Sequence, residues 1–196
     1  MVEAEKTEGL WSEGWYADAR KMPSMNYDAR PGGVLPELLV LHSISLPPGE
    51  YSNGCIERLF MNELDWSAHP YFEKIRGMKV SSHFVIDREG MLTQYVSCED
   101  RAWHAGRSSW QGRDECNDWS IGIELEGLEG SVFEEDQYTT LVSLMNDICK
   151  VYPIRWVAGH EHVAPQRKQD PGSGFDWKRV IQSVSALGKD AFPSDL

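Results

Sequence analysis

The sequence has little positive charge and few cysteines for its length. It contains 19 Lys and Arg residues against 31 Asp and Glu residues, which gives a formal net charge of −12. Because nucleic-acid binding gains most of its affinity from basic residues that displace counterions, we expect no nucleic-acid partner. The four cysteines form no CxxC pair, and this spacing indicates reduced thiols rather than a disulfide framework or a thiolate zinc site.

Long hydrophobic runs are also missing. The segment MVEAEKTEGLW at the start carries acidic residues where a signal peptide needs a basic stretch and an apolar run, and no later segment is long enough to span a bilayer. We therefore expect a cytoplasmic protein with no membrane partner.

The chain has 196 residues, 41% of them hydrophobic, without repeats or linkers. This predicts a disordered lead-in over residues 1–9 and a single domain over residues 10–190.

Three segments have the residue patterns of strands. LLVLH (38–42) is apolar up to its final histidine, which is typical of a strand that is buried on both faces and ends at a polar edge. KVSSHFVIDREGMLTQYV (79–96) predicts a hairpin with DREG at the turn. In DWSIGIELEG (118–127) apolar and polar residues alternate, which predicts a strand with one buried face and with Glu124 and Glu126 together on the other.

Other segments predict helices and a further short strand. Apolar residues at positions i, i+3, i+4 and i+7 over residues 136–152 indicate an amphipathic helix packed on a sheet. RWVAGH (155–160) predicts a strand that ends at His160, a helix is expected to begin near residue 175 or 176, and residues 56–64 predict a shorter helix. This mixture predicts an α/β (α+β) fold with a central mixed β-sheet flanked by helices, and with irregular loops on one rim.

GHEHVAPQRKQDPG (159–172) contains several metal-capable and proton-handling side chains. A catalytic zinc ion usually has three protein ligands drawn from histidines and carboxylates, and a fourth position open to water. His160 and Asp170 could supply two ligands, and His42 could supply the third if its strand is a neighbour. Lys168 lies two residues before Asp170, so both side chains emerge on the same side of an extended segment, where a lysine would stabilise an oxyanion.

Each of these signals also has an ordinary structural explanation. A strand histidine such as His42 is more often a hydrogen-bonded structural residue than a metal ligand. Alternating acids such as Glu124 and Glu126 are commonly a solvated strand face, and Lys168 could be a surface charge. The spacing H-x9-D is a weak motif by itself, so no pair of these signals assigns a site.

From about Gly14 to Val180 the chain contains, in this order, the segments GWYADAR, LLVLHSISLPPGE, AHPYFEKIRGMKVSSHF, RAWHAG, CNDWSIGIELEG and GHEHVAPQRKQDPG. In these segments and in their order it resembles the zinc-dependent N-acetylmuramoyl-L-alanine amidases. The chain is most similar to the cytoplasmic AmpD type, which acts on 1,6-anhydro-N-acetylmuramyl peptides in cell-wall recycling. The phage T7 lysozyme amidase and the peptidoglycan recognition proteins are more distant relatives, so the resemblance implies their fold. We expect a small muropeptide as the substrate and a monomeric protein.

The resemblance also implies a role for each candidate residue. The ligands of one catalytic Zn²⁺ would be His42, His160 and Asp170. Glu124 would accept the proton of the attacking water, and Lys168 would stabilise the transition state. The implied reaction hydrolyses the amide bond between the lactyl group of (1,6-anhydro-)N-acetylmuramic acid and L-alanine. Two alternatives are a muropeptide-binding module without catalysis and a zinc peptidase that acts within the stem peptide.

Two further histidines and two neighbours of Glu124 complete the expectations for the site. His83 and His104 lie in the family-like segments VSSHF and AWHAG, and we expect them to line the site or to support the ligands. Gly122 shares the strand face of Glu124, where its missing side chain would leave room for a substrate or a metal. Glu126 lies about 7 Å further along an extended strand, outside hydrogen-bond reach of the same water.

Four positions depart from the usual pattern of the AmpD type, at Ser43, Lys79, Glu115 and His162. The first three fall where sugar and peptide would be held, so they affect the expected substrate contacts rather than the metal chemistry. His162 offers a rival spacing to Asp170, H-x7-D. His160 is favoured as the ligand, because GH and APQRKQDPG align around it without a gap.

Overall fold

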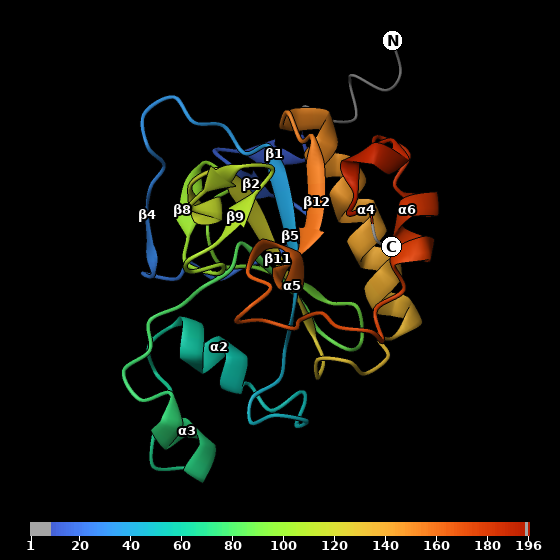
Figure 1. The fold of residues 1–196 in the computed structure, drawn as a ribbon. Helices are drawn as coiled ribbons and strands as arrows, with labels where there is room; N and C mark the ends of the chain where they lie inside the picture. Colours follow the sequence, from blue (N-terminus) through green and yellow to red (C-terminus); the bar gives the residue numbers. More distant parts are fainter. Residues whose placement is uncertain (1–8, 195) are drawn as a thin grey trace.

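The computed structural model of the protein describes residues 9–194 and 196, so the predicted disordered lead-in falls almost entirely outside the described residues. A six-stranded mixed sheet has the strand order β12–β5–β11–β6–β7–β3. Its strands β12, β5 and β11 lie in the middle of the molecule (Figure 1). The strands of the sheet are β3 (Arg20–Lys21), β5 (Leu38–Ile44), β6 (Phe84–Ile86), β7 (Leu92–Gln94), β11 (Ser120–Glu126) and β12 (Trp156–Gly159). The first four strands in this order are parallel, and β7 pairs antiparallel with β6.

Shorter elements surround this sheet. Three two-stranded pairs are β1 (Trp11–Ser12) with β2 (Trp15–Tyr16), β4 (Tyr27–Ala29) with β8 (Asp100–Ala102), and β9 (Ser109–Trp110) with β10 (Arg113–Asp114). The helices are α2 (Cys55–Phe60), α3 (Pro70–Lys74), α4 (Glu135–Val151), α5 (His160–Val163) and α6 (Trp177–Ser183), with 3₁₀ turns η1 (Cys116–Asp118) and η2 (Lys189–Ala191). Within the described residues, no helix is long and apolar enough to cross a membrane.

The elements with a clear sequence pattern form where they were predicted. The strand at 38–42, the hairpin at 79–96 and the helix at 136–152 correspond to β5, β6–β7 and α4. α2 is present but ends before the predicted boundary at residue 64, and α6 begins at Trp177, close to the predicted start. The two-residue strands, β4, β8 and α3 were not predicted, because elements this short display no period. β6 and β7 are also short, but the turn sequence DREG between them marked the hairpin.

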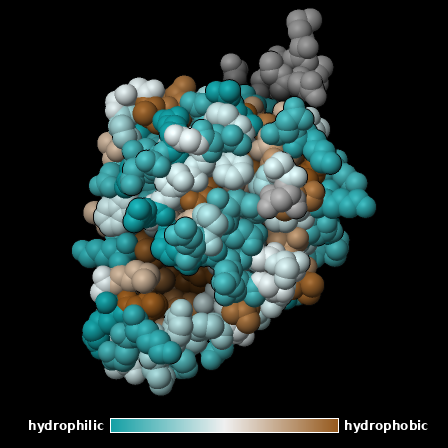
Figure 2. Space-filling model, viewed as in Figure 1, coloured by the Kyte–Doolittle hydropathy of each residue, from teal (hydrophilic) through white to brown (hydrophobic). Residues whose placement is uncertain are grey.

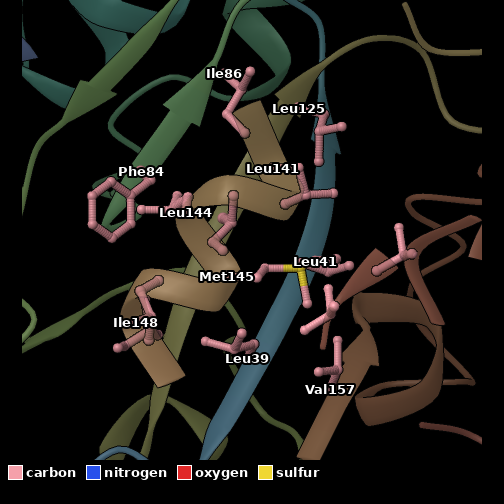
Figure 3. Close-up of a cluster of buried hydrophobic side chains, with 14 of the residues drawn as sticks. Leu39, Leu41, Phe84, Ile86, Leu125, Leu141, Leu144, Met145, Ile148 and Val157 are labelled. Atoms are coloured by element: carbon pink, nitrogen blue, oxygen red, sulfur yellow. The ribbon is translucent and has the colours of Figure 1, made fainter. Parts of the chain in front are cut away.

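Helix α4 packs its apolar stripe against one face of the sheet (Figure 3). Its buried residues contact a cluster formed by Leu39, Leu41, Phe84, Ile86, Leu125 and Val157 from four neighbouring strands. Gln137, in the first turn of α4, donates hydrogen bonds to the carbonyl oxygens of Ile86 and Glu126. The helix is therefore fixed to the carboxyl ends of β6 and β11, the edge at which the candidate site lies.

The second face of β11 is also covered, so the prediction of a half-exposed strand was wrong. All seven residues of β11 are buried, and Glu124 and Glu126 retain only 8% and 4% of their exposure. The covering segment, residues 97–117, lies on this face around Ser120 and Gly122, where His104 fills the space beside the strand. Further along the strand, the N–H of Ser52 donates a hydrogen bond to Glu126. A solvated face is therefore excluded as the explanation of the two carboxylates.

Arg30 holds the covering segment on the sheet. Its guanidinium donates hydrogen bonds of 2.8–3.3 Å to the carbonyl oxygens of Cys98, Asn117, Asp118 and Ser120. Burial lowers the pKa of Arg30 to about 10, so the side chain stays charged at neutral pH. One half-buried cation thus satisfies carbonyl oxygens of Asn117 and Asp118 within η1, of Cys98 before it and of Ser120 after it.

Replacing Arg30 by alanine is expected to destabilise the fold by about 3 kcal/mol or more, because it leaves buried carbonyl oxygens without donors. Thermal or denaturant unfolding followed by circular dichroism measures the change. Arg76→Ala is the control, because within the described part of the chain the salt-bridge partner of Arg76 is Glu73, on the surface, and exposed pairs contribute little. Equal unfolding midpoints for the two variants would show that Arg30 does not hold the segment.

Candidate metal centre

The candidate site lies where three parallel strands end side by side. In the register of β11 and β5, Glu124 is paired with His42, and in the register of β12 and β5, Gly159 is paired with Leu41. His160 follows Gly159 directly and begins α5. Because the strands are parallel and adjacent, side chains from distant parts of the sequence meet at one edge of the sheet.

Three of the predicted site residues converge on a point. Nδ1 of His42 lies 2.9 Å from Nδ1 of His160 and 3.3 Å from Oδ2 of Asp170, and Nδ1 of His160 lies 3.1 Å from the same oxygen. All three side chains are buried, and among the described residues they form a group with metal-capable geometry. The structure therefore brings together the two histidines and the aspartate that the sequence suggested.

The donor set fits a zinc ion. Nε2 of His160 lies 3.1 Å from the carbonyl oxygen of Ala105, and because a carbonyl only accepts, this nitrogen carries the proton. The Nδ1 lone pair of His160 therefore faces the other two ligand atoms. Zinc bonds to nitrogen and oxygen of about 2.0–2.2 Å in a tetrahedral arrangement place neighbouring ligand atoms roughly 3.3 Å apart, close to the separations observed.

The electrostatics keep these side chains in the forms that bind metals. Burial, together with repulsion from His160, lowers the pKa of His42 to about 4, so its imidazole is neutral at pH 7. Burial alone would raise the pKa of Asp170, but hydrogen bonds to His160 and His42 outweigh it, and the pKa lies well below the usual range. For His42 and Asp170, a neutral imidazole and an ionised carboxylate are the protonation states that coordination requires.

Glu124 is beside the cluster but is not one of its three members. Its Oε1 lies 3.9 Å from Nδ1 of His42, and its Oε2 is buried without a hydrogen-bond partner among the described residues. Burial raises the pKa of this carboxyl well above its ordinary value, and the charge of Asp170 raises it further. A carboxylate in this position has a high affinity for a proton and a free oxygen with which to accept one.

Lys168 lines the same pocket as Glu124 and the three converging side chains. It is half-buried, and its charge lowers the pKa of Glu124 in opposition to the burial effect. The structure therefore assembles in one cavity all five residues that the sequence indicated. Lys168 supplies the positive charge of that cavity from the loop that ends at Asp170.

The pocket has a volume of about 360 Å³ and one apolar wall. The wall residues come mainly from α2, from α3 and from the segments that follow them: Leu59, Phe60, Tyr71, Ile75, Met78 and Trp103. In Figure 2, hydrophobic side chains lie in a recess at the lower left, next to the segment that carries α2 and α3. The sequence did not reveal this wall, because its apolar residues have the pattern of ordinary core residues.

The prediction that the space beside Gly122 receives a substrate or a metal was wrong. A Cβ atom at this position would lie 2.6 Å from Cγ of His104, so the imidazole of His104 fills the space. His104 lines the pocket and its Nδ1 lies 2.9 Å from Nε2 of His42, which agrees with the prediction of a site-lining or supporting residue. His83 lies deeper, where its Nδ1 accepts a hydrogen bond from the backbone N–H of Gly122.

The four departures from the family pattern lie in different environments. Ser43 lines the pocket, and its hydroxyl is buried without a partner among the described residues. Lys79 is exposed, whereas Glu115 lines a separate depression and lies 3.8 Å from Arg101. His162 accepts a hydrogen bond from the N–H of Gly159, and the converging group contains His160 in its place.

Comparisons with known proteins agree with this geometry. The family model described as N-acetylmuramoyl-L-alanine amidase matches residues 33–173. The 1,6-anhydro-N-acetylmuramyl-L-alanine amidase AmpD of Citrobacter freundii is 49% identical over 178 residues, which cover 90% of this chain and 95% of that protein. A crystal structure of a selenomethionine derivative of AmpD gives a TM-score of 0.87 at 49% identity, over 90% of this chain and 99% of that one.

A more distant solved structure contains a ligand. It is the complex of the amidase AmiD from Escherichia coli with the substrate anhydro-N-acetylmuramic acid-L-Ala-D-gamma-Glu-L-Lys. Its TM-score is 0.59 at 27% identity, over 91% of this chain and 66% of that one.

The similarity to AmpD confirms the amidase fold that the resemblance implied. Since the family model spans well over half of the chain and includes the whole converging group, the chain belongs to the N-acetylmuramoyl-L-alanine amidase family of amide-bond hydrolases.

Proposed function

We propose that the protein hydrolyses the amide bond between the lactyl group of 1,6-anhydro-N-acetylmuramic acid and L-alanine, in the recycling of cell-wall fragments. The observation that carries this proposal is the convergence of His42, His160 and Asp170 beside Glu124 in one pocket. The relative from Citrobacter freundii, named for this activity, supports the choice of substrate. We also propose that the protein is a cytoplasmic monomer, as the resemblance and composition imply.

His42, His160 and Asp170 would hold one zinc ion. When bound, the ion supplies a Lewis acid that polarises the amide carbonyl and acidifies water. One carboxylate and two imidazoles bound in their neutral form would offset one of the two positive charges of the ion, so a net positive charge would remain at the centre. This charge favours the anionic transition state of amide hydrolysis.

Glu124 would act as the general base. Its unpartnered Oε2 can accept a proton from the attacking water, and its burial makes the protonated form stable. The same carboxyl can then pass the proton to the nitrogen of the departing L-alanine. Water thus supplies its oxygen to the lactyl carbonyl carbon, the C–N bond breaks, and the products are the sugar acid and a stem peptide with a free amino group.

Lys168 would stabilise the negative oxygen that forms on the carbonyl carbon. Its ammonium group comes from the loop that ends at Asp170, so its position is linked to that of the metal-binding side chains. An ammonium in a partly desolvated pocket acts more strongly on such a charge than it would in water. The apolar wall of the pocket would exclude water from the remaining surface of the substrate.

Product analysis tests this proposal. We expect zinc-loaded protein, incubated with a soluble anhydro-muropeptide, to release the intact stem peptide, which mass spectrometry identifies by its free N-terminal alanine. Cleavage within the stem peptide would indicate a zinc peptidase, and binding without any product would indicate a binding module. We also expect slower release of peptide from intact sacculi than from the soluble fragment, and the opposite order would contradict the proposed substrate class.

A further inference from the structure

We propose that His104 is a positioning residue that fixes the orientation of a metal ligand. Its imidazole accepts the Nε2–H of His42 and so keeps the Nδ1 lone pair of His42 directed at His160 and Asp170. This inference rests on the proposed metal site. It assigns to His104 a function in metal affinity rather than contact with the metal or the substrate.

The geometry connects three side chains in a row. Nε2 of His42 lies 2.9 Å from Nδ1 of His104, and Nε2 of His104 lies 3.2 Å from Oγ of Ser120. The rings of His42 and His104 are perpendicular, with centroids 5.0 Å apart. The nitrogen of His42 that contacts His104 is the one remote from the converging group, so His104 supports the ligand from behind and cannot share the metal with it.

The row of hydrogen bonds can run in two directions, and each direction gives His42 a different tautomer. In one, Ser120 donates to His104, His104 donates to His42, and the proton of His42 then lies on Nδ1, among the metal-binding atoms. In the other, His42 donates to His104 and His104 donates to Ser120. Only this second direction leaves the Nδ1 lone pair of His42 available to a metal.

The fold holds His104 in the position that this role requires. The backbone N–H groups of His104 and Ala105 donate to Oδ1 of Asn117, at 3.2 and 2.8 Å. The ring lies against Gly122, where any Cβ atom would displace it. The two hydrogen-bond partners of the His104 imidazole, His42 and Ser120, therefore lie on the strands β5 and β11. Asn117 holds the backbone of the segment that carries His104.

Two substitutions separate the hydrogen bond from the space that the ring fills. His104→Phe keeps a ring beside Gly122 but cannot accept the Nε2–H of His42. His104→Asn loses the ring but retains an amide oxygen close to the place of Nδ1. Loss of the partner of a metal-bound histidine typically lowers metal affinity about 10- to 100-fold.

The experiment measures the zinc affinity of the metal-free chain by competition with a chromophoric chelator. We expect His104→Phe to bind zinc about 10- to 100-fold more weakly than the unmodified protein, and His104→Asn to stay within a few-fold of it. Equal losses in both variants, or wild-type affinity in His104→Phe, would overturn the proposal. Thermal unfolding of the metal-free variants checks that each one folds.

A direct measurement on the unmodified protein does not depend on either variant. Long-range ¹H–¹⁵N correlation spectra of the zinc-loaded protein should show the proton of His42 on Nε2 and the proton of His104 also on Nε2. A proton on Nδ1 of His104 would reverse the row and contradict the inference. If the unmodified protein binds no zinc, the proposed metal site fails, whereas strong zinc binding by His104→Phe contradicts only the role of His104.

Discussion

Replacement of His160 by alanine is expected to strip the metal from the protein and to reduce amide hydrolysis to background. His160 contributes one of three convergent ligand atoms, and its Nδ1 lies within 3.1 Å of both others. Two remaining ligands bind zinc far more weakly, and the buried carboxylate of Asp170 would lose one of its two imidazole partners. Elemental analysis gives zinc per chain, and the rate on a soluble anhydro-muropeptide gives the activity, which should fall together with zinc content.

His162→Ala is the matched control, because it removes a histidine only two residues away. The Nδ1 of His162 accepts a hydrogen bond from Gly159, so some loss of stability is expected, but zinc should remain close to one ion per chain. If His162→Ala released the metal while His160→Ala retained it, the assignment of the ligand would be wrong. His42→Ala and Asp170→Ala should behave like His160→Ala.

Glu124→Gln and Lys168→Met are expected to lower kcat by about a hundredfold or more while zinc content and fold are preserved. Glutamine has the shape of glutamate but cannot take a proton from water, and methionine has a similar length to lysine without the charge. Removal of one group that acts only in the transition state has effects of this size and acts mainly on kcat. Steady-state kinetics gives kcat for each variant, and elemental analysis of the same samples gives the zinc content.

Glu126→Gln supplies the control for Glu124→Gln, with the same chemical change on the same strand face. Glu126 does not line the pocket, and its Oε1 accepts a hydrogen bond of 2.7 Å from the N–H of Ser52. Glutamine retains an oxygen for this bond, whereas alanine would release the loop that carries Ser52. A rate within a few-fold of the unmodified protein is expected, and an inactive Glu126→Gln with intact fold and zinc would refute Glu124 as the sole base.

Local patterns in the sequence were sufficient for much of the fold and for the identity of the candidate residues. The continuous apolar run at 38–42 required a buried strand, and the stripe over 136–152 required a helix against a sheet, because burial of such surfaces outweighs other local preferences. The spacing of His160, Lys168 and Asp170 within one short loop indicated a site that binds a metal and stabilises an oxyanion. Assignment of roles needed the family resemblance, since no single motif was specific.

Only the tertiary structure decided how the second face of β11 is used. Alternation along residues 118–127 is the same whether the polar face meets water or a covering segment, so the sequence pattern could not reveal the burial of Glu124. The covering segment is fixed by Arg30, 90 residues away from Ser120. Likewise, the space beside Gly122 is filled by His104, from another segment. These features depend on contacts between distant parts of the chain, which periodicity does not encode, and they determine the environment in which the candidate residues act.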